Sequence, residues 1–296
     1  MKAPARCAWC GAALEPSAAR GGVAPCVRCG AGTTHPWPTR AALEAAYDDW
    51  YRPPGGRFGV IGDTLLRRTR GRLARRIDST APPGPVLDVG SGEGALLDAL
   101  VARGRTATGI ERHAERPDVE ERELAEVEGE WAAVVFWHSL EHLREPGADL
   151  ERAAKLLAPG GMLFVAVPNL DSLQACAFGE RWLGLDLPRH LVHIPAGGLI
   201  SRLRKIGLRV ERVSHLRGGQ VTFGWLHGLV ATLPGSPSLY DAIRVPAARE
   251  RPVAPGRRLQ TLAAGAALLP VAVTLASVEA LLRRGGTVYV EARRLG

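Results

Sequence analysis

Short apolar runs alternate with helix-like stretches between residues 85 and 217. This alternation is typical of a parallel sheet with crossover helices, and it predicts an α/β core. Val86–Val89 has the composition of a buried strand, and Ala95–Val101 has helical spacing with Gly104 as its C-terminal cap. Further strands are expected over residues 106–110 and 287–291.

The pattern changes on both sides of this core. Residues 37–84 have helix-like stretches and predict a helical linker that ends in Pro-Pro-Gly-Pro. Residues 218–286 are rich in apolar segments, and 259–278 is uncharged and lies between arginine pairs, as in a membrane-spanning helix. The strand at 287–296 must return to the sheet, however. We therefore expect 218–286 to be a helical insertion, with 259–282 either in the membrane interface or in a homodimer contact.

Residues 1–36 contain two C-x2-C pairs, Cys7 with Cys10 and Cys26 with Cys29. This spacing is typical of two knuckles that complete a tetrahedral zinc site, as in a zinc ribbon. Four thiolates leave no open position for water, so the zinc is expected to be structural, with a binding energy of order 10 kcal/mol. The pattern leaves open whether the module only stabilises the protein or also caps a pocket. Cys176 stands apart and is expected to be a buried thiol.

The most informative segment reads Val-Leu-Asp-Val-Gly-Ser-Gly-Glu-Gly from residue 86 to 94. Its glycines allow a tight turn and the close approach of a ligand, and the helix start that follows offers N–H groups to a carboxylate. Glu111 ends the next strand, twenty-one residues after Gly90, where an acid accepts hydrogen bonds from ribose hydroxyls. The G-x-G-x-G spacing argues against a nicotinamide or flavin cofactor.

At these residues the chain resembles the class I S-adenosylmethionine-dependent methyltransferases. The resemblance includes Phe-Trp-His-Ser-Leu-Glu-His-Leu at 136–143, the run 157–165, Val-Pro-Asn at 167–169, and 182–190 with His193. The last run is typical of a bacterial branch that is sometimes encoded near cell-envelope glycan genes. The resemblance implies a Rossmann-like, seven-stranded α/β methyltransferase sheet and S-adenosylmethionine as cofactor.

The resemblance also assigns the cofactor contacts. Gly90 and Gly92 would line the methionine end, Glu111 would hold the ribose, and Asp88 would support the glycine loop. The adenine would lie between Glu123 and Leu124. Because only about ten residues separate Glu111 from this adenine side, the helix after the second strand is expected to be short or missing. The full set is Asp88, Gly90, Ser91, Gly92, Gly94, Glu111, Glu123, Leu124 and Trp137.

The protein must align the acceptor with the methyl group and remove a proton if the acceptor is a hydroxyl. His138, after the fourth strand, is the first candidate base, and His190 is the second. Arg189 is a candidate clamp for a phosphate or carboxylate of the acceptor. Ubiquinone-pathway O-methyltransferases hold a divalent cation with an E-x-x-E-H run. Here histidine replaces the first acid at 138–142, so no catalytic cation is expected, and His142 and His193 are expected to be packing residues.

Composition changes this picture only in part. The chain is 46% apolar and 23% charged, which is enough for a buried core. Its net charge of +8 comes almost wholly from arginine, which favours anionic partners, although codon bias in a GC-rich genome explains it equally well. No apolar signal-peptide core precedes the cysteines, so a cytoplasmic location is expected, at the inner face of the membrane if 259–282 meets lipid.

The leading hypothesis is O-methylation of a sugar, glycan or lipid-linked small molecule. One alternative is an RNA methyltransferase with a zinc ribbon, although Trp-His-Ser-Leu at 137–140 departs from the Asn-Pro-Pro-Tyr type used for exocyclic amines, and nucleic acid is not the favoured partner. A second alternative is a scaffold that binds S-adenosylmethionine without turnover.

Overall fold

The computed structural model describes residues 6–47, 53, 56–112, 114, 116–216, 219–235 and 238–296. Its centre is a seven-stranded sheet in the order β5-β4-β3-β6-β7-β10-β9. The strands are β3 (Val86–Val89), β4 (Ala107–Glu111), β5 (Val119–Glu121), β6 (Trp131–Trp137), β7 (Leu157–Pro168), β9 (Leu208–Ser214) and β10 (Thr287–Arg294).

The first five strands of that order are parallel, and β10 lies antiparallel between β7 and β9. The predicted Rossmann-like seven-stranded sheet is therefore confirmed. The strand order reverses between β3 and β6, and ligands of open α/β sheets bind at the carboxyl ends of the strands at such a point. None of the described residues between β4 and β5 is helical.

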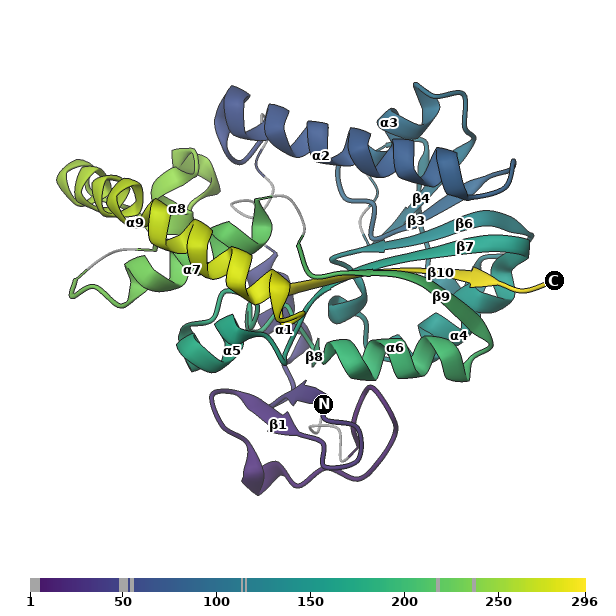
Figure 1. Ribbon diagram of the computed structural model, residues 1–296, viewed down its shortest axis with the longest axis horizontal. Coiled ribbons are helices and arrows are strands. Elements are labelled where there is room, and N and C mark those ends of the chain that lie inside the picture. Colours follow the sequence, from purple (N-terminus) through teal and green to yellow (C-terminus); the bar gives the residue numbers. More distant parts are fainter. Residues whose placement is uncertain are drawn as a thin grey trace.

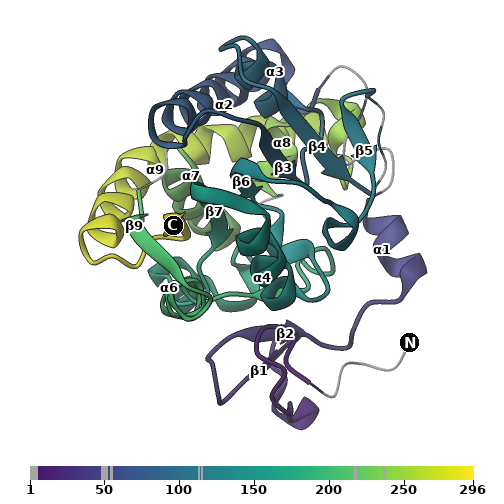
Figure 2. The ribbon, with the colours of Figure 1, turned by 90° about the vertical axis from the view of Figure 1, so that its right-hand side faces the viewer.

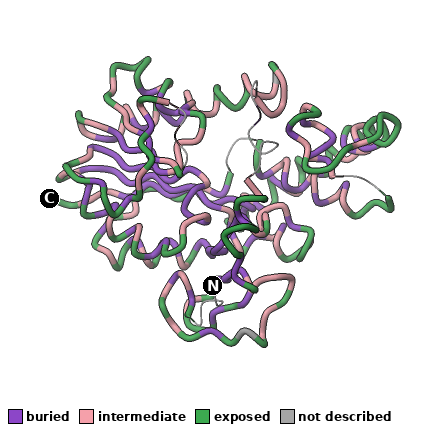
Figure 3. Tube along the Cα trace, turned by 180° about the vertical axis from the view of Figure 1, so that it is seen from behind, coloured by how far each residue is buried: buried purple, intermediate pink, exposed green. Residues whose placement is uncertain are grey.

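Helices cover both faces of the sheet (Figures 1 and 3). On one face, α2 (Gly59–Thr80) and α3 (Ala95–Val101) bury Leu73, Ile77 and Leu100 against β6 and β7. On the other lie α4 (Pro146–Leu156) and α6 (Ala196–Lys205). The segment expected to be a linker thus contains a helix that covers the sheet, together with the short α1 (Arg40–Ala46), which Thr39 caps.

The cysteine-rich segment lies below α4 and α6 (Figure 2). It is connected to the core by strand pairing with β8, which precedes α6 in the chain. Its strands β1 (Val23–Pro25) and β2 (Gly32–Thr34) form a second sheet with β8 (Val192–His193). Residues separated by about 160 positions are therefore neighbours, because Gly32 pairs with His193. Trp9 and Trp37 are buried in the same apolar cluster as α4 and α6.

The insertion between β9 and β10 contains α7 (Gln220–Ala231), α8 (Leu239–Ile243) and α9 (Pro255–Leu281). The insertion also contains the short turn η5 (Pro246–Ala248). The shorter helical elements elsewhere are η1 (Pro16–Ala18), η2 (Leu124–Glu126), η3 (Leu140–His142), α5 (Leu173–Phe178) and η4 (Gly179–Arg181). Within the described ranges, α9 is the one helix long and apolar enough to cross a membrane, and only 22% of its most apolar window is buried.

Cys176 differs from the expectation. It is exposed, because Gln174 takes the buried position of α5 and bonds to Glu279, which turns Cys176 outward. The Arg284 guanidinium donates to its sulfur at 3.4 Å.

Candidate active site

The glycine turn (residues 90–94) follows β3 at the carboxyl edge of the sheet. Gly90, Gly92 and Gly94 have φ angles of 77°, 58° and 74°, a region that side chains rarely adopt. A Cβ atom on Gly90 would lie 2.5 Å from the Cβ of Ser139, so the turn is also tightly packed there. The sequence therefore needs glycine here for two separate reasons, backbone conformation and space.

Two carboxylates meet at this turn. Glu111 accepts hydrogen bonds from the backbone amides of Gly92, at 3.0 Å, and Arg112, at 3.1 Å. Asp88 is buried, and burial raises the pKa of its carboxyl group to about 7, with the charge of Arg70 opposing the shift. Its Oδ1 atom has no hydrogen-bond partner among the described residues. A buried, unsatisfied carboxylate oxygen is chemically suited to an ammonium group.

The other expected cofactor residues lie along the same edge. Ser91 is part of the turn, and Glu123 and Leu124 follow β5. Leu124 is buried, whereas Glu123 is exposed and forms a capping box with Glu126. Trp137 ends β6, where the Arg70 guanidinium lies 4.7 Å from its ring centroid.

The histidine cluster (His138, Glu141, His142 and His190) begins directly after β6. His138 has a φ of 54°, which is unfavourable for a residue with a side chain and is typical of functional sites. Its Nδ1 lies 3.4 Å from Oε1 of Glu141, and its Nε2 lies 3.3 Å from the side-chain amide of Gln220 in α7. The ring is thus held between a carboxylate and an amide.

Glu141 lies at the centre of this cluster and is 1% exposed. Burial opposes its ionisation, but the hydrogen bond from His138 and the charges of His138, His190 and His142 outweigh burial, so its pKa is lowered. Nε2 of His190 lies 3.8 Å from the same carboxylate oxygen as His138. Glu141 is therefore an anion surrounded by imidazoles.

Hydrogen bonds to carbonyl groups assign the protons of two of these rings. Nδ1 of His190 lies 2.9 Å from the carbonyl of Gly184, and Nδ1 of His142 lies 3.0 Å from that of Arg189. A carbonyl can only accept, so each of these bonds requires a proton on Nδ1. Burial and then His190 lower the pKa of His142 to about 4, which keeps that ring neutral. One ligand atom each from Glu141, His142 and His190 lie within 4.8 Å of one another, a donor set that suits a divalent cation.

Arg189 does not present an open clamp. Its guanidinium is buried and donates to the Asp186 carboxylate and to the carbonyl of Ala46. These bonds fix the loop that carries His190 instead.

The β8 strand connects this loop to the cysteine module. Thr34 of β2 donates to the carbonyl of His190 at 2.6 Å, and its hydroxyl lies 3.1 Å from Nε2 of His193. Burial and then the charge of His190 lower the pKa of His193 to about 3, so it is a neutral packing residue. The space between this strand and the cluster is closely packed and has no room for a water molecule; it is lined by Glu141, Pro168, Trp182, Gly184, His190, Val192 and His193.

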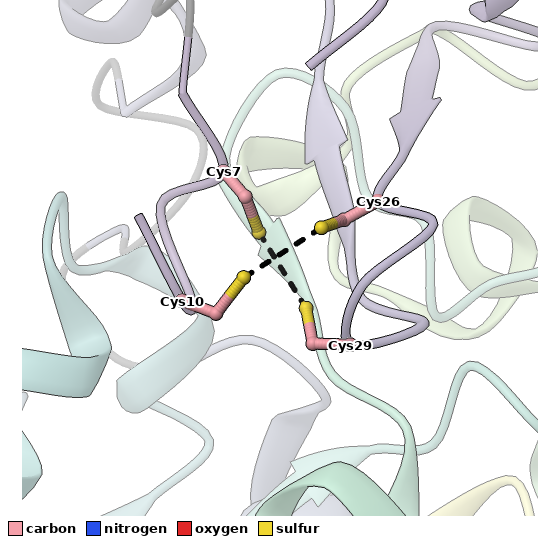
Figure 4. Close-up of side chains that lie close together, drawn as sticks. All are labelled: Cys7, Cys10, Cys26 and Cys29. Atoms are coloured by element: carbon pink, nitrogen blue, oxygen red, sulfur yellow. Dashed lines mark hydrogen bonds between the residues drawn. The ribbon is translucent and has the colours of Figure 1, made fainter. Parts of the chain in front are cut away.

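The four cysteine sulfurs point toward one centre (Figure 4). Cys7 and Cys29 are 3.7 Å apart, Cys10 and Cys26 are 3.6 Å apart, and all four sulfurs lie within 4.8 Å of one another. Zinc–sulfur bonds of about 2.3 Å in a tetrahedron place the sulfurs about 3.8 Å apart. The two pairs are also alike in backbone, since a glycine with a φ near 72° follows each of them. The geometry fits a zinc ion, and the cysteines are free of disulfides.

Comparison with known proteins agrees with this geometry. A family model described as a methyltransferase domain matches residues 63–213, which is half of the chain. The chain belongs to the class I S-adenosylmethionine-dependent methyltransferase family.

Its curated relatives in this methyltransferase family include the ubiquinone biosynthesis O-methyltransferase of Xylella fastidiosa, 31% identical over 45% of this chain and 63% of that protein. The protein of the same name from Caulobacter vibrioides is 34% identical over 48% of this chain and 68% of its own length. The chain thus spans less than two thirds of the first relative. A methyltransferase structure from Archaeoglobus fulgidus matches 77% of this chain and 94% of its own, with a TM-score of 0.49 and 16% identity.

Several residues of this methyltransferase site could not be recognised from sequence patterns. The hydroxyl of Tyr47 lies 2.9 Å from Nδ1 of His142, and Asp186 lies 3.6 Å from Nε2 of His190. Glu141 was visible only as part of the H-x-x-E-H run, which does not reveal that three histidines converge on it. Gln220 lies eighty-two residues beyond His138, inside an apolar helix.

Proposed function

We propose that this protein is an S-adenosylmethionine-dependent O-methyltransferase that acts on a hydroxyl of a sugar, glycan or lipid-linked small molecule. One observation carries the proposal: Ser139, which lies between His138 and Glu141 in the chain, joins the histidine cluster to the strand that enters the glycine turn. The hydroxyl of Ser139 donates to the carbonyl of Val89, at the end of the strand that enters the turn. A cofactor cradle and a group able to accept a proton therefore share one edge of the sheet.

The residues at the turn fit the cofactor. The unsatisfied Asp88 carboxylate is suited to the ammonium group of a methionine tail, and the positive φ angles of Gly90 and Gly92 form the tight turn that such cofactor sites use. Glu111 is placed to accept from ribose hydroxyls. When bound, S-adenosylmethionine supplies an activated methyl group and its own leaving group.

His138 is the group that we assign to proton removal. It lies just after β6, with Nδ1 facing the Glu141 carboxylate at 3.4 Å, so we assign the proton transfer to Nε2, which would exchange its contact with Gln220 for the acceptor hydroxyl. Glu141 is then a positioning residue. A divalent cation held by Glu141, His142 and His190 would assist by lowering the pKa of the acceptor hydroxyl.

The acceptor class rests on two supports. The curated relatives are named as ubiquinone biosynthesis O-methyltransferases, which favours a hydroxyl acceptor. The run at 182–190 with His193 resembles a bacterial branch sometimes encoded near cell-envelope glycan genes, which favours a sugar or a lipid-linked sugar.

We also propose that Cys7, Cys10, Cys26 and Cys29 hold one structural zinc ion, and that the module caps the acceptor pocket. The pairing of β2 with β8 and the bond from Thr34 to the backbone of His190 support this role. The module then stabilises one wall of the pocket without taking part in the chemistry.

Calorimetric titration with S-adenosylmethionine tests the cofactor assignment. Glu111→Ala should weaken binding by about 1.5–3 kcal/mol, as expected for a lost charge-assisted bond. Glu120→Ala, which removes an exposed carboxylate nine residues along the chain, is the control and should bind normally. Unchanged affinity in Glu111→Ala would refute the assignment. Transfer of labelled methyl groups into sugar and lipid extracts, followed by mass spectrometry, identifies the acceptor.

A further inference from the structure

The long helix α9 has its large apolar side chains on the wrong side for a soluble protein. Its buried positions are Thr261, Gly265, Ala272, Ala276 and Glu279. Its outward positions include Leu259, Val273 and Leu281, which are 70%, 48% and 83% exposed. A helix that served only to pack on its own protein would turn its leucines and valines inward.

The inward side is nevertheless well ordered. The buried Glu279 accepts hydrogen bonds from the Trp225 indole at 2.8 Å and from the Gln174 amide at 2.8 Å, and Ala272 and Ala276 pack on α7. The orientation of α9 is thereby fixed, and the aliphatic face stays outward. Figure 3 shows this segment, at the right of that view, with much of its length exposed.

Arginines lie at both ends of α9. Arg257 and Arg258 are in the first turn, and Arg283 and Arg284 follow the last. All four are exposed, although Arg257, Arg258 and Arg284 also donate to the carbonyl groups of Gly235, Ala242 and Asp171. Cations in a first turn oppose the helix dipole, so helix stability does not explain the first pair. Between residues 255 and 284 the single acid is the buried Glu279. The outward side of α9 is therefore aliphatic in the middle, basic at both ends and free of acids.

We propose that α9 lies flat on an anionic lipid surface, with its aliphatic face in the headgroup region and its terminal arginines on lipid phosphates. Self-association fits less well, because two copies crossing on this face, parallel or antiparallel, would bring arginine pairs together with no exposed acid to offset them. A transmembrane crossing is excluded by connectivity, since α9 leads directly into β10, which lies between β7 and β9.

The proposal has a consequence for the active site, which rests on the proposed function. Gln220, at the start of α7, contacts His138, and α9 packs on α7. Thr287, just after α9, pairs with Pro168 at the carboxyl end of β7, where the candidate site lies. A docked α9 would hold the acceptor entrance close to the membrane, within reach of a lipid-linked substrate.

Flotation of the purified full chain with vesicles tests the docking itself. The wild type should bind phosphatidylglycerol vesicles, bind pure phosphatidylcholine vesicles poorly, and dissociate from the former as salt rises. Leu269→Glu with Val273→Glu should weaken binding by about tenfold or more. Val27→Glu with Leu216→Glu, two exposed apolar residues elsewhere, adds the same charge and should leave binding unchanged.

Arg257→Gln with Arg283→Gln is a milder second variant, which should lower anionic binding by about tenfold and flatten the salt dependence. Melting temperature and S-adenosylmethionine affinity, measured on every variant, show that the fold and the cofactor site are intact, independently of methyl transfer. Equal binding by the wild type and the Leu269/Val273 variant would overturn the proposal. So would a dimer, seen by light scattering, that this variant dissociates.

Discussion

The glycine turn and the histidine cluster lie at the same edge of the sheet and meet at Ser139, but they are assembled in different ways. The turn and its carboxylates come from residues 88–111, a continuous stretch, and use backbone groups and glycine conformations. The cluster draws on α1, the end of β6, the loop before β8 and α7. The cysteine module also supports its wall. The glycine turn, on the cofactor side, should therefore keep its structure when distant parts of the chain are changed. The histidine cluster, on the acceptor side, should depend on those distant parts.

Loss of the cysteine centre should produce the largest difference between the two sides: a large loss of methyl transfer with little change in cofactor affinity. Cys26→Ser should release about one equivalent of zinc and lower methyl transfer by roughly 100-fold or more, because the module cannot fold without its metal and β8 loses its partner. The affinity for S-adenosylmethionine should stay within about threefold. Metal analysis, titration and activity assays measure these effects.

Cys176→Ser is the matched control, since it removes an exposed cysteine outside the cluster. It should leave zinc content and activity unchanged. A Cys26→Ser protein that loses cofactor binding as severely as activity would show that the two sides are not separable in this way.

The next effect should be confined to the acceptor side. His138→Gln removes the proposed base and should lower kcat by about 100-fold or more, while the cofactor affinity stays within about twofold. His227→Gln, in α7 but outside the cluster, should retain normal kcat. If His138→Gln weakened cofactor binding and kcat in equal proportion, the ring would belong to the cofactor side.

The smallest effect concerns Asp88. Burial raises its pKa to about 7 from 3.8, so the neutral form is favoured in the folded protein, and stability is lost as the pH rises through this range. Asp88→Asn avoids that loss. Its melting temperature should exceed that of the wild type at pH 8 by at least about 2–4 °C, corresponding to about 1 kcal/mol.

At pH 5 this difference should shrink. At pH 8, where the wild-type group is ionised, cofactor binding should be weaker in the variant because its carboxylate is gone. Asp171→Asn, at an exposed position, should show no pH-dependent difference. An Asp88→Asn difference that is the same at pH 5 and pH 8 would contradict the assigned burial effect.

The same contrast explains what could be predicted from the sequence. The turn, β3, α3 and Glu111 depend on local spacing, and the strands and helices expected there are present with boundaries shifted by one residue at most. The cysteine cluster follows from spacing too. Asp186 and Tyr47, by contrast, lie near the cluster only because the chain folds back on itself.

Two further features could not be predicted because they depend on tertiary contacts. Arg189 was expected to be free for a ligand, but Asp186 takes its guanidinium. The outward face of α9 was not determined by periodicity, since both of its sides are uncharged over 259–278 and only the bonds of Glu279 fix which side is buried.

The place of β10 in the sheet has a consequence for biosynthesis. This strand lies between β7 and β9, yet it is translated after the whole α7–α9 segment. β9 therefore has no partner on the β7 side until β10 is available, and the sheet cannot close earlier. Closure of the sheet and packing of the α7–α9 segment, which lies between β9 and β10 in the chain, are thereby coupled in one late folding step.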